Sequence, residues 1–175
     1  MKKFLLLNFI ILATFLQSCD ERITPKTNDL IVETPPTNTI LLSSHSWQYN
    51  EVIISGGGKT FVQFSRPNSI GLSSDYGTTK VTYKADGSQE MESKGVINRG
   101  KWKFSADEKK LTIIDSNGGG YPFDIITLDK SELEFSVTYK KIDYKDDAGW
   151  VKLMKNLGLP ETSTEYIRVF SFIPI

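Results

Sequence analysis

The sequence predicts an all-β fold: an antiparallel meander of about eight strands that closes into a barrel, with one short α-helix before the last strand. After residue 40, short segments alternate apolar and polar residues, and clusters of Gly, Asn, Asp and Ser separate them. One late segment instead repeats its apolar residues at helical spacing. We favour a closed barrel because closure leaves no strand edge unpaired.

The clearest strand is Leu133–Tyr139, where every second residue is apolar and therefore faces the same side. Lys101–Phe104 alternates in the same way and directs Trp102 and Phe104 inward. In chain order, the segments that fit strands are Trp47–Ile54, Thr60–Phe64, Lys80–Lys84, Glu90–Asn98, Lys101–Phe104, Lys110–Asp115, Tyr121–Leu128, Leu133–Tyr139 and Glu165–Phe172.

The segment Asp146–Leu159 has the pattern of an amphipathic helix. Its apolar residues Trp150, Leu153, Met154 and Leu157 follow the spacing i, i+3, i+4, i+7. Asp146 or Asp147 can cap the start, while Gly158 and Pro160 end the helix. We expect the apolar stripe to pack against the sheet or to fill one end of the barrel, with a partner-binding or membrane-lying helix as the alternative.

The first eighteen residues have the features of a secretory signal peptide. Two lysines precede the apolar stretch Phe4–Leu16, which is shorter than the roughly 20 residues of a membrane-spanning helix. The tetrapeptide Leu16-Gln17-Ser18-Cys19 resembles the lipobox of bacterial lipoproteins, and Cys19 is the sole cysteine. The resemblance implies cleavage before Cys19 and a diacylglyceryl thioether on its sulfur. The alternative is a plain signal peptide whose last part happens to contain a cysteine.

Residues 19–39 are expected to form the lipidated cysteine and a flexible tether, and residues 40–175 the folded domain. Three prolines and many Thr, Asn and acidic residues disfavour helix and sheet in the tether. Leu30-Ile31-Val32 is its one apolar triplet. This organisation predicts a protein anchored in the cell envelope through Cys19, at the outer membrane, with the tether holding the domain clear of the lipid.

Several short motifs occur in the order found in the lipocalin-like domains of bacterial lipoproteins. They are Ser46-Trp47, Tyr83-Lys84-Ala85-Asp86-Gly87, Gly100-Lys101-Trp102-Lys103-Phe104, Lys110-Leu111-Thr112-Ile113 and Ile125-Ile126-Thr127-Leu128-Asp129-Lys130-Ser131-Glu132-Leu133. Together they cover roughly residues 41–173, which therefore resemble such a domain. The resemblance implies an eight-stranded barrel and says little about the ligand. The chain departs from the usual pattern in its Gly-rich loops and in the helix before the last strand.

The composition argues against several classes of function. Lys plus Arg equals Asp plus Glu, 21 each, so bulk charge gives no support to nucleic-acid binding. One cysteine and one histidine exclude a cysteine-cluster zinc site and leave little material for other metal sites. We therefore expect no metal, no cofactor, no nucleic-acid partner and no catalytic residues.

Three local patterns that suggest chemistry have simpler explanations. Ser55-Gly56-Gly57-Gly58-Lys59-Thr60 faintly resembles a phosphate-binding loop, but a strand-like segment follows it instead of a helix. His45 lies among serines without an identifiable acid or oxyanion donor, and we expect an exposed linker residue. Asp143, Asp146 and Asp147 lack EF-hand spacing, and helix capping accounts for two of them.

The inward aromatic residues are the remaining candidates for a binding site. Those we assign to it are Trp47, Tyr83, Trp102, Phe135 and Tyr139. Such side chains can line a cavity for an apolar molecule, or they can simply fill a solid barrel. The sequence thus predicts a non-catalytic, lipid-anchored protein that binds a small apolar or amphipathic ligand. The alternative is a protein-interaction module, such as an accessory subunit or inhibitor of an envelope enzyme; an envelope hydrolase is the weaker third hypothesis.

Overall fold

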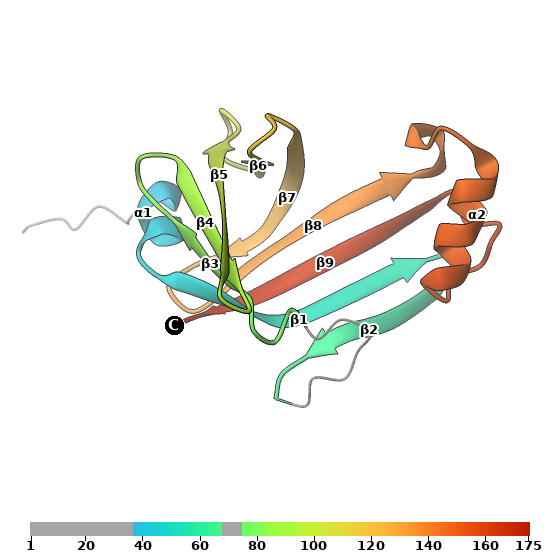
Figure 1. Cartoon of the computed structure of the whole chain (residues 1–175), viewed down its shortest axis with the longest axis horizontal. Coiled ribbons are helices and arrows are strands. Elements are labelled where there is room, and N and C mark those ends of the chain that lie inside the picture. The colour runs from blue at the N-terminus through green and yellow to red at the C-terminus, as the bar shows by residue number, and fades with distance from the viewer. Residues whose placement is uncertain (1–36, 68–74) are drawn as a thin grey trace, which may run out of the picture. The chain divides into compact units, whose positions relative to one another are not determined.

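The computed structural model describes residues 37–67 and 75–175 (Figure 1). The predicted signal peptide 1–18, the predicted lipidation site Cys19 and the tether as far as residue 36, including Leu30–Val32, lie outside the described residues. In chain order the elements are α1 (Asn38–Ser43), β1 (Ser46–Gly56), β2 (Lys59–Ser65), β3 (Lys80–Tyr83), β4 (Ser88–Ser93), β5 (Val96–Phe104), β6 (Lys110–Ile114), β7 (Gly120–Leu128), β8 (Leu133–Lys140), the 3₁₀ turn η1 (Lys141–Asp143), α2 (Asp147–Asn156) and β9 (Glu165–Pro174).

Eight antiparallel strands close into a barrel, which confirms the predicted fold class. The ring runs β1-β3-β4-β5-β6-β7-β8-β9 and closes where β9 pairs with β1. Only the first three residues of β1, Ser46–Gln48, pair with β3. From Glu51 onward the same edge of β1 pairs with β2, which is the extra strand outside the ring.

A β-bulge in β1 keeps its apolar side chains on the inner face. The register with β9 shifts between Tyr49 and Glu51, so the inward positions continue from Trp47 and Tyr49 to Val52 and Ile54. Without that extra residue the second half of the strand would turn its apolar residues toward solvent.

Two of the hairpin turns in the sheet bear on the sequence predictions. Gly57 and Gly58 have φ of +56° and +75° and connect β1 to β2, so the Gly-rich segment is a hairpin turn followed by a strand, as predicted. Lys94 and Gly95 have φ of +51° and +79° and connect β4 to β5. The prediction of one strand over Glu90–Asn98 was therefore wrong, because the chain reverses in its middle.

The short helix α1 was not predicted. The Thr37 side chain accepts a hydrogen bond from the Ile40 amide and caps its start. Leu42 is fully buried, and α1 packs against β3 and β7 at one end of the barrel. The indole Nε1–H of Trp47 donates to the Leu42 carbonyl over 2.9 Å, which fixes the helix to the first strand.

The predicted helix before the last strand is present as α2. Asp146 caps it by accepting a hydrogen bond from the Gly149 amide, and Gly158 follows its end with φ of +69°. In Figure 1, α2 lies beside the ends of β1, β8 and β9, away from α1. Trp150 and Met154 are fully buried there and pack on Ile54 and Tyr166.

The interior therefore contains two apolar clusters. The barrel core extends from Leu42 and Trp47 to Phe135, Phe170 and Phe172. A smaller cluster beneath α2 comprises Ile54, Trp150, Met154, Leu159 and Tyr166. Within the described residues, neither α-helix is long and apolar enough to cross a membrane.

Candidate functional site

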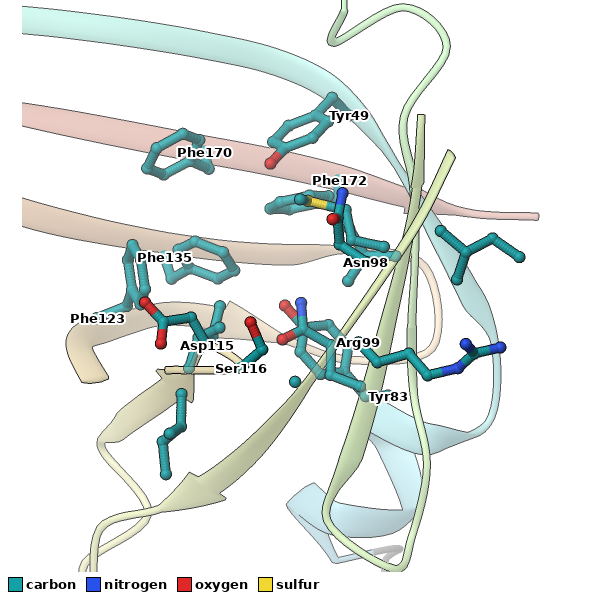
Figure 2. Close-up of a pocket in the computed structure, with 17 residues that line it drawn as sticks. Tyr49, Tyr83, Asn98, Arg99, Asp115, Ser116, Phe123, Phe135, Phe170 and Phe172 are labelled. Atoms are coloured by element: carbon teal, nitrogen blue, oxygen red, sulfur yellow. The ribbon is translucent and has the colours of Figure 1, made fainter. Parts of the chain in front are cut away.

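The barrel contains a mainly apolar cavity of about 540 Å³ (Figure 2). Its lining comes from strands β1, β3–β9 and the loop after β6: Tyr49, Val81, Tyr83, Gln89, Met91, Ile97, Asn98, Arg99, Gly100, Ile113, Ile114, Asp115, Ser116, Phe123, Phe135, Phe170 and Phe172. The volume falls within the range of about 300–1,000 Å³ that is usual for small-molecule sites.

Packed aromatic rings form one wall of the cavity. Phe135 of β8 lies 5.5 Å from Phe170 and 5.1 Å from Phe172 of β9, measured between ring centroids. Phe123 of β7 lies 4.8 Å from Phe135, and Tyr49 of β1 lies 4.3 Å from Phe172. Strand alternation places all five rings on the inner face, and their mutual contacts make this wall rigid.

Neutral polar groups interrupt the apolar lining. The hydroxyls of Tyr49 and Tyr83 and the side-chain amide of Gln89 have no hydrogen-bond partner among residues 37–67 and 75–175. Burial raises the pKa of both tyrosines well above their usual value of about 10, so both phenols stay protonated. Three uncharged groups able to form hydrogen bonds are therefore available to a bound molecule.

The cavity opens to solvent between β5 and the β6–β7 turn. Residues Lys101–Phe104 of β5 pair with β6, whereas the first part of β5 pairs with β4 alone. The exposed residues Asn98, Asp115 and Ser116 lie along this opening. Arg99 belongs to the rim but extends away from the cavity in Figure 2, and its Nε lies 3.3 Å from Glu90 Oε1.

Gly100 fixes how closely the two sides of the opening approach each other. A Cβ at this position would lie 2.5 Å from the Ile114 carbonyl oxygen, closer than such atoms can come. Glycine therefore permits β5 to contact β6 at this point before the two strands separate. On the other side, the Asp115 carboxylate accepts hydrogen bonds from the Asn117 and Gly119 amides over 2.8 and 3.0 Å and shapes the turn.

Of the five aromatic residues assigned to the site from sequence, Tyr83 and Phe135 line the cavity. Trp47 is buried beneath α1. Trp102 is 6% exposed, and its Nε1–H donates to the Lys84 carbonyl over 3.0 Å. Tyr139 stacks on Tyr166 with ring centroids 4.6 Å apart. The structure thus gives two of these residues a place in the cavity wall and the other three positions in the surrounding apolar packing.

Several lining residues were not assigned from sequence. Phe170 and Phe172 could have been predicted, because they occupy alternate positions along the predicted strand Glu165–Phe172. Tyr49 shares the inner face with Trp47 and carried the same signal. Gln89 and Met91 carried none, because a polar residue and a methionine do not by themselves indicate which face of a strand is buried.

Among the described residues, the histidine and the carboxylates do not form a further centre. His45 is half-buried and packs edge-on against Trp47 with ring centroids 6.0 Å apart, so the expectation of an exposed linker residue was wrong. Within the part of the chain that the structure describes, no three His, Cys, Asp or Glu residues lie close enough to hold a metal ion.

A comparison with protein-family models matches residues 44–135 to the family described as lipocalin-like domain. The match covers just over half of the chain and includes β1 to β7 and the first residues of β8. It therefore contains most strands that line the cavity, whereas α2 and β9 lie beyond it. A search of curated proteins finds no match.

Proposed function

Because the chain belongs to the lipocalin-like domain family, we propose that it is a binding protein that holds one small apolar or amphipathic molecule in its barrel. A binding role needs no catalytic group. The aromatic wall supplies contact area, and the tyrosine and glutamine side chains orient the molecule through hydrogen bonds.

The unpartnered polar groups inside the cavity carry this proposal. A barrel that only needed a solid core would place apolar atoms where the Tyr49 and Tyr83 hydroxyls and the Gln89 amide lie, because buried polar groups without partners cost free energy. These three groups instead border a space of about 540 Å³. A ligand with one or two polar atoms and a mainly apolar body would satisfy them and fill that space.

We further propose that the protein is anchored in the cell envelope, at the outer membrane, through a lipid on Cys19. The support is the N-terminal sequence, in which a signal-like segment ends at the chain's sole cysteine. Residues 1–18 would be removed, and the residues between Cys19 and α1 would link the lipid to the domain. Acyl chains make such anchoring stable, with about 0.8 kcal/mol for each buried CH₂ group.

Native mass spectrometry of the full chain, purified from envelope extracts without harsh detergent, tests the binding proposal. We expect the native mass to exceed the denatured mass by a constant amount that identifies one small molecule. Equal native and denatured masses would contradict the proposal. A co-purified protein in place of the small molecule would favour the alternative, a protein-interaction module.

A pair of matched variants shows whether the molecule occupies the cavity. Met91 lines the cavity on β4, so Met91→Trp places a bulky indole ring in that space. Ile126 of β7 is 53% exposed, so Ile126→Trp adds the same ring elsewhere on the protein. We expect Met91→Trp to lose the extra mass and Ile126→Trp to keep it. If both variants keep the extra mass, the molecule binds outside the barrel.

A further inference from the structure

Arg168 is a charged residue on the inner face of β9. Along this strand Tyr166, Arg168, Phe170 and Phe172 occupy successive inward positions. Phe170 belongs to the barrel core and Tyr166 to the cluster beneath α2. Arg168 therefore lies between the two apolar clusters, at the end of the aromatic wall that faces α2.

Two aromatic rings lie close to the guanidinium of Arg168. Its Cζ lies 6.0 Å from the ring centroid of Tyr139 and 6.0 Å from that of Phe170. Its positive charge also acts on the phenols of Tyr49 and Tyr76, where it opposes the rise in pKa that burial produces. The guanidinium is thus close to two residues that line the cavity, Tyr49 and Phe170.

Arg168 differs from the other arginines of the described chain in having no polar partner. Its Nε is buried without a hydrogen bond, and it forms no ion pair with a described carboxylate. Arg66, in contrast, donates from Nε to the Tyr49 carbonyl over 2.6 Å and from a terminal nitrogen to the Gly77 carbonyl over 2.8 Å. Arg99 pairs with Glu90. A buried, charged donor without an acceptor is costly and calls for an explanation.

We propose that Arg168 binds the carboxylate of an amphipathic ligand whose apolar part lies against the aromatic wall. This inference rests on the proposed binding function and adds the chemical class of the ligand, an apolar monocarboxylate. Arginine suits this role because its planar fork of N–H groups can engage both oxygens of a carboxylate.

The alternative is a purely structural role, in which Arg168 stabilises the wall through its contacts with the Tyr139 and Phe170 rings. The two roles differ in one measurable respect. A structural arginine would not discriminate between ligands that have the same apolar chain and different head groups. An anion-binding arginine would favour the charged head group, and neutralising it would abolish that preference.

The test compares dodecanoate with dodecan-1-ol, which share an apolar chain and differ in head group. Binding of each to the full chain is measured by isothermal titration calorimetry at concentrations at which both probes are dissolved as monomers. A charge-assisted hydrogen bond contributes more than a neutral one, so we expect dodecanoate to bind about 10- to 100-fold more tightly. In Arg168→Gln the two affinities should become equal, with that of dodecan-1-ol unchanged.

Lys103→Gln is the matched control, because Lys103 is exposed on β5 and the substitution removes one positive charge. It should retain the preference for dodecanoate. Equal affinities of the wild-type chain for both probes would overturn the inference and leave the binding function intact. A preference for dodecanoate that survives in Arg168→Gln would also overturn it. Binding of neither probe would overturn it too, and native mass spectrometry would decide the binding function separately.

Discussion

Tyr83→Phe removes one hydroxyl from the cavity wall and leaves the aromatic ring in place. Tyr83 is 1% exposed, and its hydroxyl has no hydrogen-bond partner in the described part of the chain. Its ring packs edge-on against Trp102 with centroids 6.1 Å apart, a contact that phenylalanine preserves. The substitution therefore isolates what the hydroxyl contributes to stability and to ligand binding.

The expected change in stability is small and positive. A buried hydroxyl without a partner disfavours the folded state by about 1–3 kcal/mol in mutational data, and water in the cavity offsets part of this cost. We expect Tyr83→Phe to raise the free energy of unfolding by at most about 1 kcal/mol. A bound ligand that accepts or donates a hydrogen bond at Tyr83 would lose about 0.5–1.5 kcal/mol of binding free energy.

Thr79→Val is the matched control, because it removes a buried hydroxyl that has partners. Thr79 is 5% exposed, and its Oγ1 donates to the Asp75 carbonyl over 2.6 Å and lies 3.0 Å from Ser93 Oγ. Valine has nearly the same shape and removes these two contacts, while the Asp75 carbonyl keeps its hydrogen bond from the Thr78 amide over 3.1 Å. We expect this variant to lose about 0.5–1.5 kcal/mol of unfolding free energy, the usual contribution of a hydrogen bond.

Urea unfolding followed by circular dichroism measures both variants, and equal slopes against urea concentration would show that the unfolding transition itself is unchanged. Native mass spectrometry of the same preparations reports the bound molecule. A loss of more than about 1 kcal/mol in Tyr83→Phe would refute the reasoning, because it would mean that the hydroxyl makes a stabilising hydrogen bond in the folded protein.

Two further predictions concern the rest of the fold. Trp150→Ala should cost α2 about 3–5 kcal/mol of packing free energy and remove the hydrogen bond from Trp150 Nε1 to the Ser163 carbonyl. Hydrogen exchange should then show loss of protection in α2 alone, and loss throughout the barrel would contradict the separation into two apolar clusters. At high pH the protein should lose stability, because burial raises the folded-state pKa of Tyr49 and Tyr83. Their contribution to the free energy of unfolding is complete below the unfolded-state pKa of about 10 and is lost as the pH rises toward the folded-state pKa. The loss is at most about 1.4 kcal/mol per pH unit for each tyrosine. The tyrosinate absorbance of Tyr83, taken as the difference between wild type and Tyr83→Phe so that the other tyrosines, such as the exposed Tyr121, cancel, should therefore appear together with unfolding. Its appearance in the folded protein near pH 10 would count against the burial of this phenol.

Much of the fold was predictable from local pattern. The segment Leu133–Tyr139 identifies β8 because one of its faces is buried along its whole length. The helix α2 was identified from its apolar stripe, its Asp146 cap and Gly158. Both elements combine a clear repeat of apolar residues with residues that mark their ends. Each lies on the boundary between the core and solvent, where such a repeat is strongest.

Elements without a one-sided pattern were missed or misplaced. The six residues of α1 make fewer than two helical turns, too short for a period to emerge, and Leu42 is their one buried residue. The turn at Lys94-Gly95 interrupts a polar stretch in which neither strand end has a consistently buried face. The sequence also could not distinguish the aromatic residues that line the cavity from those that fill the core. Trp47 and Tyr83 have the same alternation, and only the position of α1 over Trp47 distinguishes them.

The pairing of β1 and β9 places the aromatic cavity next to the half-buried Arg168. On one edge β1 changes partner from β3 to β2, and Tyr49 lies at that change with its ring directed inward. On the other edge β1 pairs with β9 along most of its length, across the bulge between Tyr49 and Glu51, and β9 presents Phe172, Phe170 and Arg168 in order. The wall thus passes from rings to a guanidinium along a single strand. An amphipathic ligand that lies along β9 would place its anionic end at Arg168 and its apolar part against Phe170 and Phe172.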